Sequence, residues 1–75
     1  MLIQSIRFEK SKWSKARATK WIKSRHYKNL PPSEKYNKQY PNWYAYRQIQ
    51  PRLLKNMRTM KFKDLGILFI VGVPN

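Results

Sequence analysis

Apolar residues lie mostly in short runs along the chain, and one run is uninterrupted. Leu65 to Val73 reads Leu-Gly-Ile-Leu-Phe-Ile-Val-Gly-Val and is followed by Pro74. Its length is typical of a strand, since a membrane-spanning helix needs about 20 apolar residues. Apolar side chains fall on both faces of this run at a period of two. The run therefore predicts a central strand that is covered on both sides.

Two other stretches alternate between apolar and polar residues. Residues 2–9 predict a half-buried strand that pairs with the central strand, and residues 42–49 predict a further strand that ends before Pro51. The first strand is expected to place Leu2, Gln4, Ile6 and Phe8 on one face, and Ile3, Ser5 and Arg7 on the other.

Residues 12–26 predict the only long helix. Ser14 is a suitable N-cap, and Ala18, Trp21 and Ile22 fall on one stripe at helical spacing. The tryptophans of this stretch are interpreted as core residues, with a stacking platform as the alternative.

The remaining segments are shorter or irregular. Residues 27–41 contain three prolines and predict a basic, aromatic loop. The spacing of Leu53, Leu54 and Met57 predicts a short helical turn within residues 52–60. The fold expected for residues 1–75 is a single α+β domain in the order β-α-β-β. It has a small three-stranded, mainly antiparallel sheet with 65–73 in the middle and one helix packed on a face.

The chain is strongly basic. It has 17 Lys and Arg against 3 Asp and Glu, a formal net charge of +14 in 75 residues. Self-repulsion on this scale opposes the compact state, and a polyanion relieves it. Nucleic acid is the first candidate partner and an acidic protein surface the second, whereas no membrane partner is expected. The alternative is that the cations form only a solvated surface.

The predicted phosphate contacts fall into two groups. The first group, called the helix group, lies on or just before the predicted helix and carries most of the charge. The second group, called the second patch, lies in the later part of the chain and adds to this charge. Arg47 is left open between a structural cation–π pair and a phosphate ligand. Tyr44 and Tyr46 could stack bases from one sheet face, but packing against the helix is favoured. The candidate residues are Lys12, Lys15, Arg17, Lys20 and Lys23 in the helix group, and Arg47, Arg52 and Arg58 in the second patch.

Catalytic chemistry is not expected from this composition. The chain has no cysteine, one histidine and three scattered acids. These residues supply no paired carboxylates, no zinc-ligand cluster and no acid to orient His26 in a triad. No catalytic residue, metal site or cofactor is therefore predicted, and the chain is expected not to be an enzyme. His26 is interpreted as a partner of the helix dipole rather than a ligand.

Several short motifs together resemble a small domain found in open reading frames of tailed phages and large DNA viruses. The resemblance covers most of the chain. It implies a compact α+β domain and a viral source, and it carries no activity with it. The motif residues are Phe8, Lys10, Trp13, Ala18, Trp21, His26, Tyr46-Arg47-Gln48, Pro51, Arg58-Thr59, Gly66-Ile67 and Val71-Gly72.

Two functional hypotheses follow. The first is a small viral basic protein that binds DNA or RNA non-specifically through phosphate contacts. The second is a minor virion component that cements capsid or core proteins in a larger assembly. Both place the protein in the virion or in the cytoplasm or nucleus of the host cell, and neither predicts secretion, because residues 1–8 alternate and lack the features of a signal peptide.

Overall fold

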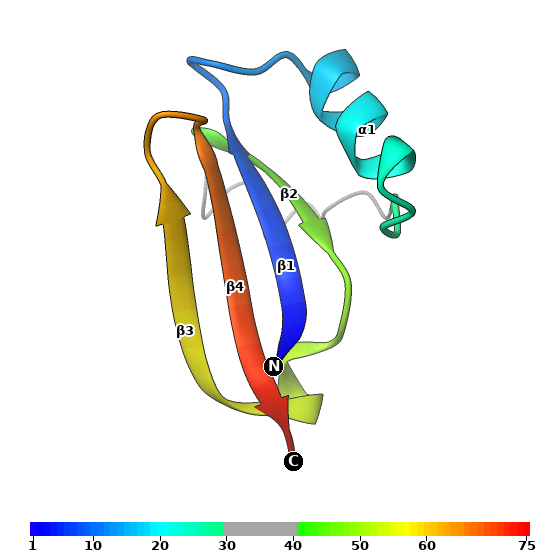
Figure 1. Ribbon diagram of the computed structural model, residues 1–75, viewed down its shortest axis with the longest axis vertical. Helices are drawn as coiled ribbons and strands as arrows, with labels where there is room; N and C mark the ends of the chain where they lie inside the picture. The colour runs from blue at the N-terminus through cyan, green and yellow to red at the C-terminus, as the bar shows by residue number, and fades with distance from the viewer. Residues whose placement is uncertain (30–40) are drawn as a thin grey trace.

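The computed structural model describes residues 1–29 and 41–75 and contains one helix, one 3₁₀ turn and four strands (Figure 1). The strands form a single antiparallel sheet in the order β2-β1-β4-β3. The two central strands are thus the first and last of the chain, and β2 and β3 form the edges. The elements are β1 (Leu2–Glu9), α1 (Lys15–Ser24), β2 (Trp43–Arg47), η1 (Pro51–Leu53), β3 (Leu54–Phe62) and β4 (Ile67–Pro74).

The predicted α+β class, with an antiparallel sheet and one helix, is confirmed, but the predicted number of strands is wrong. The sheet has four strands rather than three, because the segment predicted as a helical turn over residues 52–60 forms η1 and most of β3. A bulge interrupts the β3–β4 register between Lys55 and Arg58, and Asn56 has a φ of 53°. The extra residue breaks the two-residue period, so the apolar spacing imitates a helix.

A second bulge, in β1, changes which of its side chains share a face relative to the prediction. The β1–β4 register shifts between Ile3 and Ser5, so Ile3 pairs with Val71 while Ile6 pairs with Phe69. Because Val71 and Phe69 are two residues apart, Ile3 and Ile6 lie on the same face. The sequence alternation had placed them on opposite faces, which is wrong for Ile3.

The core lies between α1 and the sheet and is centred on Phe8. This side chain is 0% exposed, and its ring makes edge contacts with Trp13, Trp21 and Tyr46 at centroid distances of 4.9, 5.5 and 5.6 Å. The helix contributes its two buried residues, Ala18 and Ile22, to the same cluster. The aromatic residues on both sides of Phe8 therefore join the helix to β1 and β2.

Both ends of α1 are capped. The Ser14 hydroxyl accepts a hydrogen bond from the Arg17 amide at 3.1 Å, which confirms the predicted N-cap. At the other end, His26 adopts a φ of 60°, its amide donates to Lys23 O, and the Tyr27 amide donates to Ile22 O. This pair of bonds is a Schellman motif with His26 in the left-handed position. The caps fix α1 at 10 residues, shorter than the predicted range of 12–26.

Gln48 attaches the chain after the helix to the end of β2. Its side-chain oxygen accepts from the Lys28 amide at 2.8 Å, and its side-chain nitrogen donates to Lys28 O at 2.9 Å. The Gln48 side-chain amide thus pairs with both backbone groups of Lys28, as the backbone of a neighbouring strand would. Most of the predicted loop over residues 27–41 lies outside the described residues.

The helix covers only part of the sheet. In Figure 1, α1 lies toward the β2 side and β3 lies at the opposite edge. Several large apolar side chains of β3 are correspondingly exposed: Met57 at 40%, Met60 at 48% and Phe62 at 41%. The half of the sheet that includes β3 therefore presents apolar side chains to solvent.

We predict that Phe8→Ala lowers the free energy of unfolding by about 3–5 kcal/mol, the usual cost of removing a buried aromatic side chain. This loss is comparable to the whole stability of a small domain, so the variant is expected to be unfolded at 37 °C. Urea denaturation followed by circular dichroism measures the effect.

Leu53→Ala is the control for this prediction, because Leu53 is 52% exposed at the far end of the sheet. Its loss should be within about 0.5 kcal/mol, as for most surface substitutions. A Phe8→Ala protein as stable as the Leu53→Ala protein would show that the core is held elsewhere.

Candidate nucleic-acid interface

Three lysines form the outer surface of α1: Lys15, Lys20 and Lys23. All three are exposed, and within the described part of the chain no hydrogen bond or ring contact involves their side chains. At 100° per residue they lie within an arc of about 140°, and Lys15 and Lys23 are about 12 Å apart along the helix axis. The sequence predicted all three, and the structure gathers them on one surface.

The other two cations of the predicted helix group are held by local contacts. The Lys12 amine donates to Lys63 O at 2.6 Å, which ties the turn before α1 to the β3–β4 turn. The Arg17 guanidinium lies 4.4 Å from the centre of the Trp13 ring and donates to Lys12 O at 3.1 Å. These contacts give both residues a structural role, so they are less free to follow a ligand than the lysines of α1.

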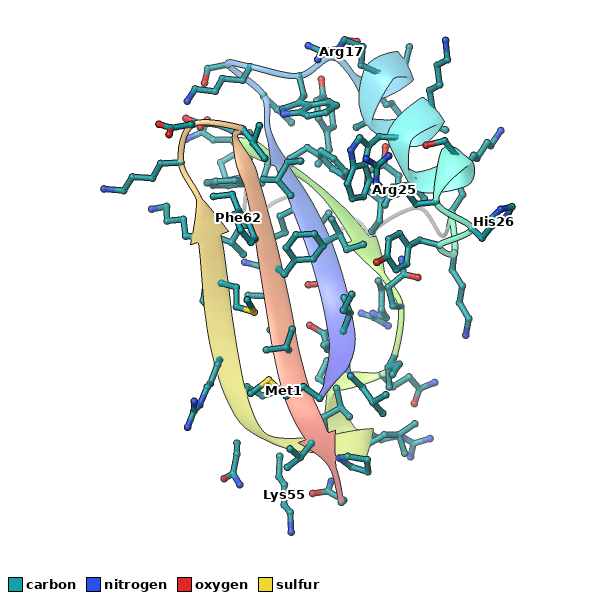
Figure 2. All side chains as sticks on the ribbon, in the orientation of Figure 1. Met1, Arg17, Arg25, His26, Lys55 and Phe62 are labelled. Atoms are coloured by element: carbon teal, nitrogen blue, oxygen red, sulfur yellow. The ribbon has the colours of Figure 1, made fainter. Side chains whose placement is uncertain are left out.

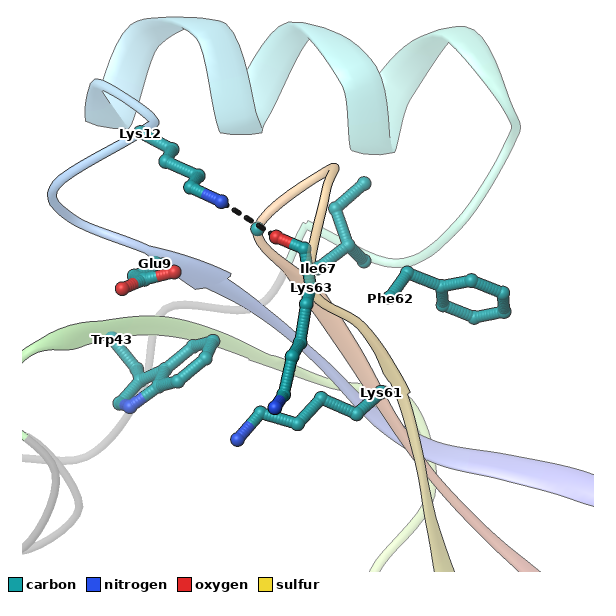
Figure 3. Close-up of a pocket in the computed structure, with 8 residues that line it drawn as sticks. Glu9, Lys12, Trp43, Lys61, Phe62, Lys63 and Ile67 are labelled. Atoms are coloured by element: carbon teal, nitrogen blue, oxygen red, sulfur yellow. Dashed lines mark hydrogen bonds between the residues drawn. The ribbon is translucent and has the colours of Figure 1, made fainter.

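A pocket of about 280 Å³ lies where the β3–β4 turn meets the start of α1 (Figure 3). In Figure 3, Lys61 and Lys63 extend toward the half-buried Trp43, while Phe62 points away from it. Sequence reasoning had left Lys61 and Lys63 out of the candidate residues. Their alternation around Phe62 at the end of a strand was the available signal. The lining residues are Glu9, Lys12, Trp43, Lys61, Phe62, Lys63, Gly66 and Ile67.

The helix is a stronger anion site than this pocket, because carboxylates lie at the pocket and none lies on the helix. Of the three acids in the chain, two lie in the described residues: Glu9 lines the pocket and Asp64 belongs to the β3–β4 turn beside it. The helix has no acidic residue in its sequence. An anion near α1 therefore meets positive charge without a neighbouring carboxylate on the same element.

The predicted second patch is not brought together as one surface. Arg47 pairs with Ser5 on the β2 edge, and Arg58 pairs with Val71 on the β3 edge. Two strands separate these edges, a distance of about 14 Å at 4.8 Å per strand. Arg52 lies in η1, where its Nε donates to Gln50 Oε1 at 2.7 Å. All three residues are exposed, but each stands at a different place on the sheet.

The tyrosines proposed as base readers pack in the core side of the sheet. Tyr46 is 4% exposed and its hydroxyl shares a hydrogen bond of 2.9 Å with Thr19 Oγ1. Tyr44 is half-buried against the same cluster, with the Lys10 amine 5.1 Å from its ring centre. The favoured interpretation of these residues as packing partners of the helix is therefore confirmed for Tyr46 and agrees with the position of Tyr44.

His26 lies at the surface beyond the end of α1 (Figure 2). Within residues 1–29 and 41–75 no group of three or more His, Cys, Asp or Glu side chains is arranged to hold a metal ion. His26 is thus at the helix terminus where the sequence placed it, and its backbone conformation is the feature that the structure adds.

Comparisons with other proteins add no family. No family model, curated protein or solved structure matches the chain. In the part of the chain that the structure describes, no helix is both long enough and apolar enough to cross a membrane.

We predict that His26→Gly raises the free energy of unfolding by about 0.5–1 kcal/mol. A left-handed conformation costs a non-glycine residue about 1–2 kcal/mol, and the greater chain entropy of glycine offsets about 0.5–1 kcal/mol of that gain. Urea denaturation provides the measurement. A less stable glycine variant would mean that the imidazole makes a stabilising contact at the helix end.

Proposed function

We propose that this domain binds nucleic acid without sequence preference, chiefly through phosphate contacts from the outer face of α1. The single observation that carries the proposal is the surface of three exposed lysines on a helix that has no acid, with no partner for these lysines among the residues that the structure describes. Phosphate contacts of this type release counterions and supply most of the affinity of non-specific binding.

The spacing of these lysines suits a nucleic-acid backbone. Lys15 and Lys23 are about 12 Å apart along the axis, and phosphates of one duplex strand follow at about 3.4 Å along the helix axis. The three side chains therefore reach over about three to four phosphates of one strand. Lysine amines are point charges on flexible stems, and contacts to phosphates carry no sequence information directly, which agrees with binding that ignores sequence.

A second candidate function is a structural role as a minor virion component that cements capsid or core proteins. The observation that favours it is the row of exposed apolar side chains on the edge strand β3, because apolar patches are typical of protein interfaces. Cross-linking of intact particles distinguishes the candidates: a structural component cross-links to shell proteins at fixed stoichiometry, whereas a nucleic-acid binder is recovered with the genome.

We predict that changing Lys15, Lys20 and Lys23 together to Gln weakens binding to every sequence alike. Each phosphate contact contributes about −0.9 to the slope of log affinity against log salt for duplex DNA and about −0.7 for single strands. Loss of three contacts should therefore make the slope shallower by about 2–3. Fluorescence anisotropy with labelled oligonucleotides across a salt series measures this slope, and Gln keeps a helix propensity close to that of Lys.

The matched control removes three charges elsewhere, by changing Arg47, Arg52 and Lys55 together to Gln. These exposed residues lie on the sheet and η1, away from the helix. If both triple variants lose the same slope, the binding reflects net charge and the helix has no special role. If the parent protein binds neither DNA nor RNA at low salt, the proposed function is wrong.

A further inference from the structure

A continuous row of aromatic rings crosses the helix-bearing side of the molecule. We call it the aromatic track: Phe62, Phe69, Trp21 and Tyr27. Neighbouring ring centroids are 5.6 Å apart for Phe62 and Phe69, 6.4 Å for Phe69 and Trp21, and 6.0 Å for Trp21 and Tyr27. The track therefore runs without a break from the edge strand β3, over β4, to the segment that follows α1.

The track is open to solvent, most of all at its β3 end. Phe62 is 41% exposed, and the other three rings are half-buried. Phe62 pairs with Ile67, which belongs to the core cluster under α1, so Phe62 lies on the helix side of the sheet but beyond the reach of the helix. Met60, 48% exposed, extends the apolar surface along β3.

Two arginines lie at the aromatic track, Arg25 over the face of one of its rings and Arg58 on the edge strand. The Arg25 guanidinium lies 4.3 Å from the centre of the Trp21 ring. Arg58 pairs with Val71, which is two residues from Phe69, so its side chain leaves the sheet on the track side. Figure 2 shows Phe62 near the turn that joins β3 to β4, and Arg25 beside the helix. The track thus combines ring surfaces with positive charge at its borders.

We propose that the aromatic track is a stacking platform for the bases of single-stranded nucleic acid. The proposal rests on the proposed function and names the partner: a single strand, whose phosphates contact Arg25 and Arg58. Non-specific single-strand binders combine aromatic rings, on which bases stack, with cations that follow the backbone. A duplex cannot use the rings in this way, because its bases are already stacked at about 3.4 Å, whereas the rings are about 6 Å apart.

Charge complementarity favours a single strand over a second copy of the chain as the occupant of this surface. Each copy has a formal net charge of +14, and Arg25 and Arg58 border the face that two copies would have to share. Their mutual repulsion opposes such a dimer. A single strand of nucleic acid has apolar base faces that can stack on the rings. It also has the negative charge that compensates the arginines.

The test compares binding of a fluorescein-labelled 20-nucleotide oligothymidylate with binding of a 20-base-pair duplex by fluorescence anisotropy at low salt. We expect the 75-residue protein to bind the single strand more tightly. Phe62→Leu, which keeps an apolar side chain but removes the ring, should weaken oligothymidylate binding at least about 5-fold, the lower limit for losing one stacked base. Duplex affinity should stay within about twofold.

Two controls separate stacking from general effects. Phe62→Tyr retains the ring and should bind oligothymidylate as the parent does. Leu53→Ala shortens another exposed apolar side chain, at the far end of the sheet, and should also leave binding unchanged. Circular dichroism shows whether each variant is folded. Loss of binding in Phe62→Leu that is restored in Phe62→Tyr supports the platform.

The outcomes distinguish this proposal from the proposed function. If Phe62→Leu binds oligothymidylate as the parent does, while the triple lysine variant has a shallower salt slope, the platform is overturned and phosphate binding stands. If neither probe binds the parent, both proposals are overturned. If Phe62→Leu changes only the sedimentation of the free protein, the track is a contact between copies and the platform is overturned.

Discussion

The packing of three rings around Phe8 is the interaction on which the rest of the structure depends. Phe8 is 0% exposed and contacts Trp13 before the helix, Trp21 within it and Tyr46 on the neighbouring strand. Among the described residues, the helix itself buries only Ala18 and Ile22 and adds a hydrogen bond between Thr19 and Tyr46. Most helix stability in proteins comes from such tertiary packing. The position of the lysines of α1 therefore follows from an aromatic contact on the opposite side of the helix.

The small size of that helix explains why aromatic surface remains exposed. A helix of 10 residues is about 15 Å long. The strands β3 and β4 have nine and eight residues and extend about 27–30 Å. The helix can therefore bury only the part of the sheet around Phe8. The β3 side of the same face keeps Met60 and Phe62 in solvent, although Phe62 still packs edge-on against Phe69. Exposed rings beside a basic helix are thus a geometric consequence of this architecture.

The elements that obey one simple period could be predicted from the sequence, and those with a bulge could not. The Ser14 cap and the stripe of Ala18 and Ile22 located α1, and Ile67–Pro74 was recognisable as an interior strand. The strand β3 was missed because the bulge near Asn56 disrupts its alternation, and because an edge strand with solvent on both sides need not alternate. Because β3 was not predicted, the sheet was expected to have three strands, and the position of Phe62 on a sheet edge could not be inferred.

The same error limited what could be predicted of the candidate site. The lysines of α1 could be assigned to one helix from the sequence, and the observed helix places them within one arc. The aromatic track needed tertiary contacts: Phe69 and Trp21 are 48 residues apart in the sequence, and only the β3–β4 pairing and the docking of α1 bring the four rings into one row. Trp21 belongs both to α1 and to the track, and the C-cap residue Arg25 lies over its ring, so the docking of α1 fixes where the track lies relative to the lysines. At 100° per residue, Trp21 lies about 100° from Lys20 and about 120–160° from Lys15 and Lys23 around the helix, so the rings and the lysines occupy different flanks of α1.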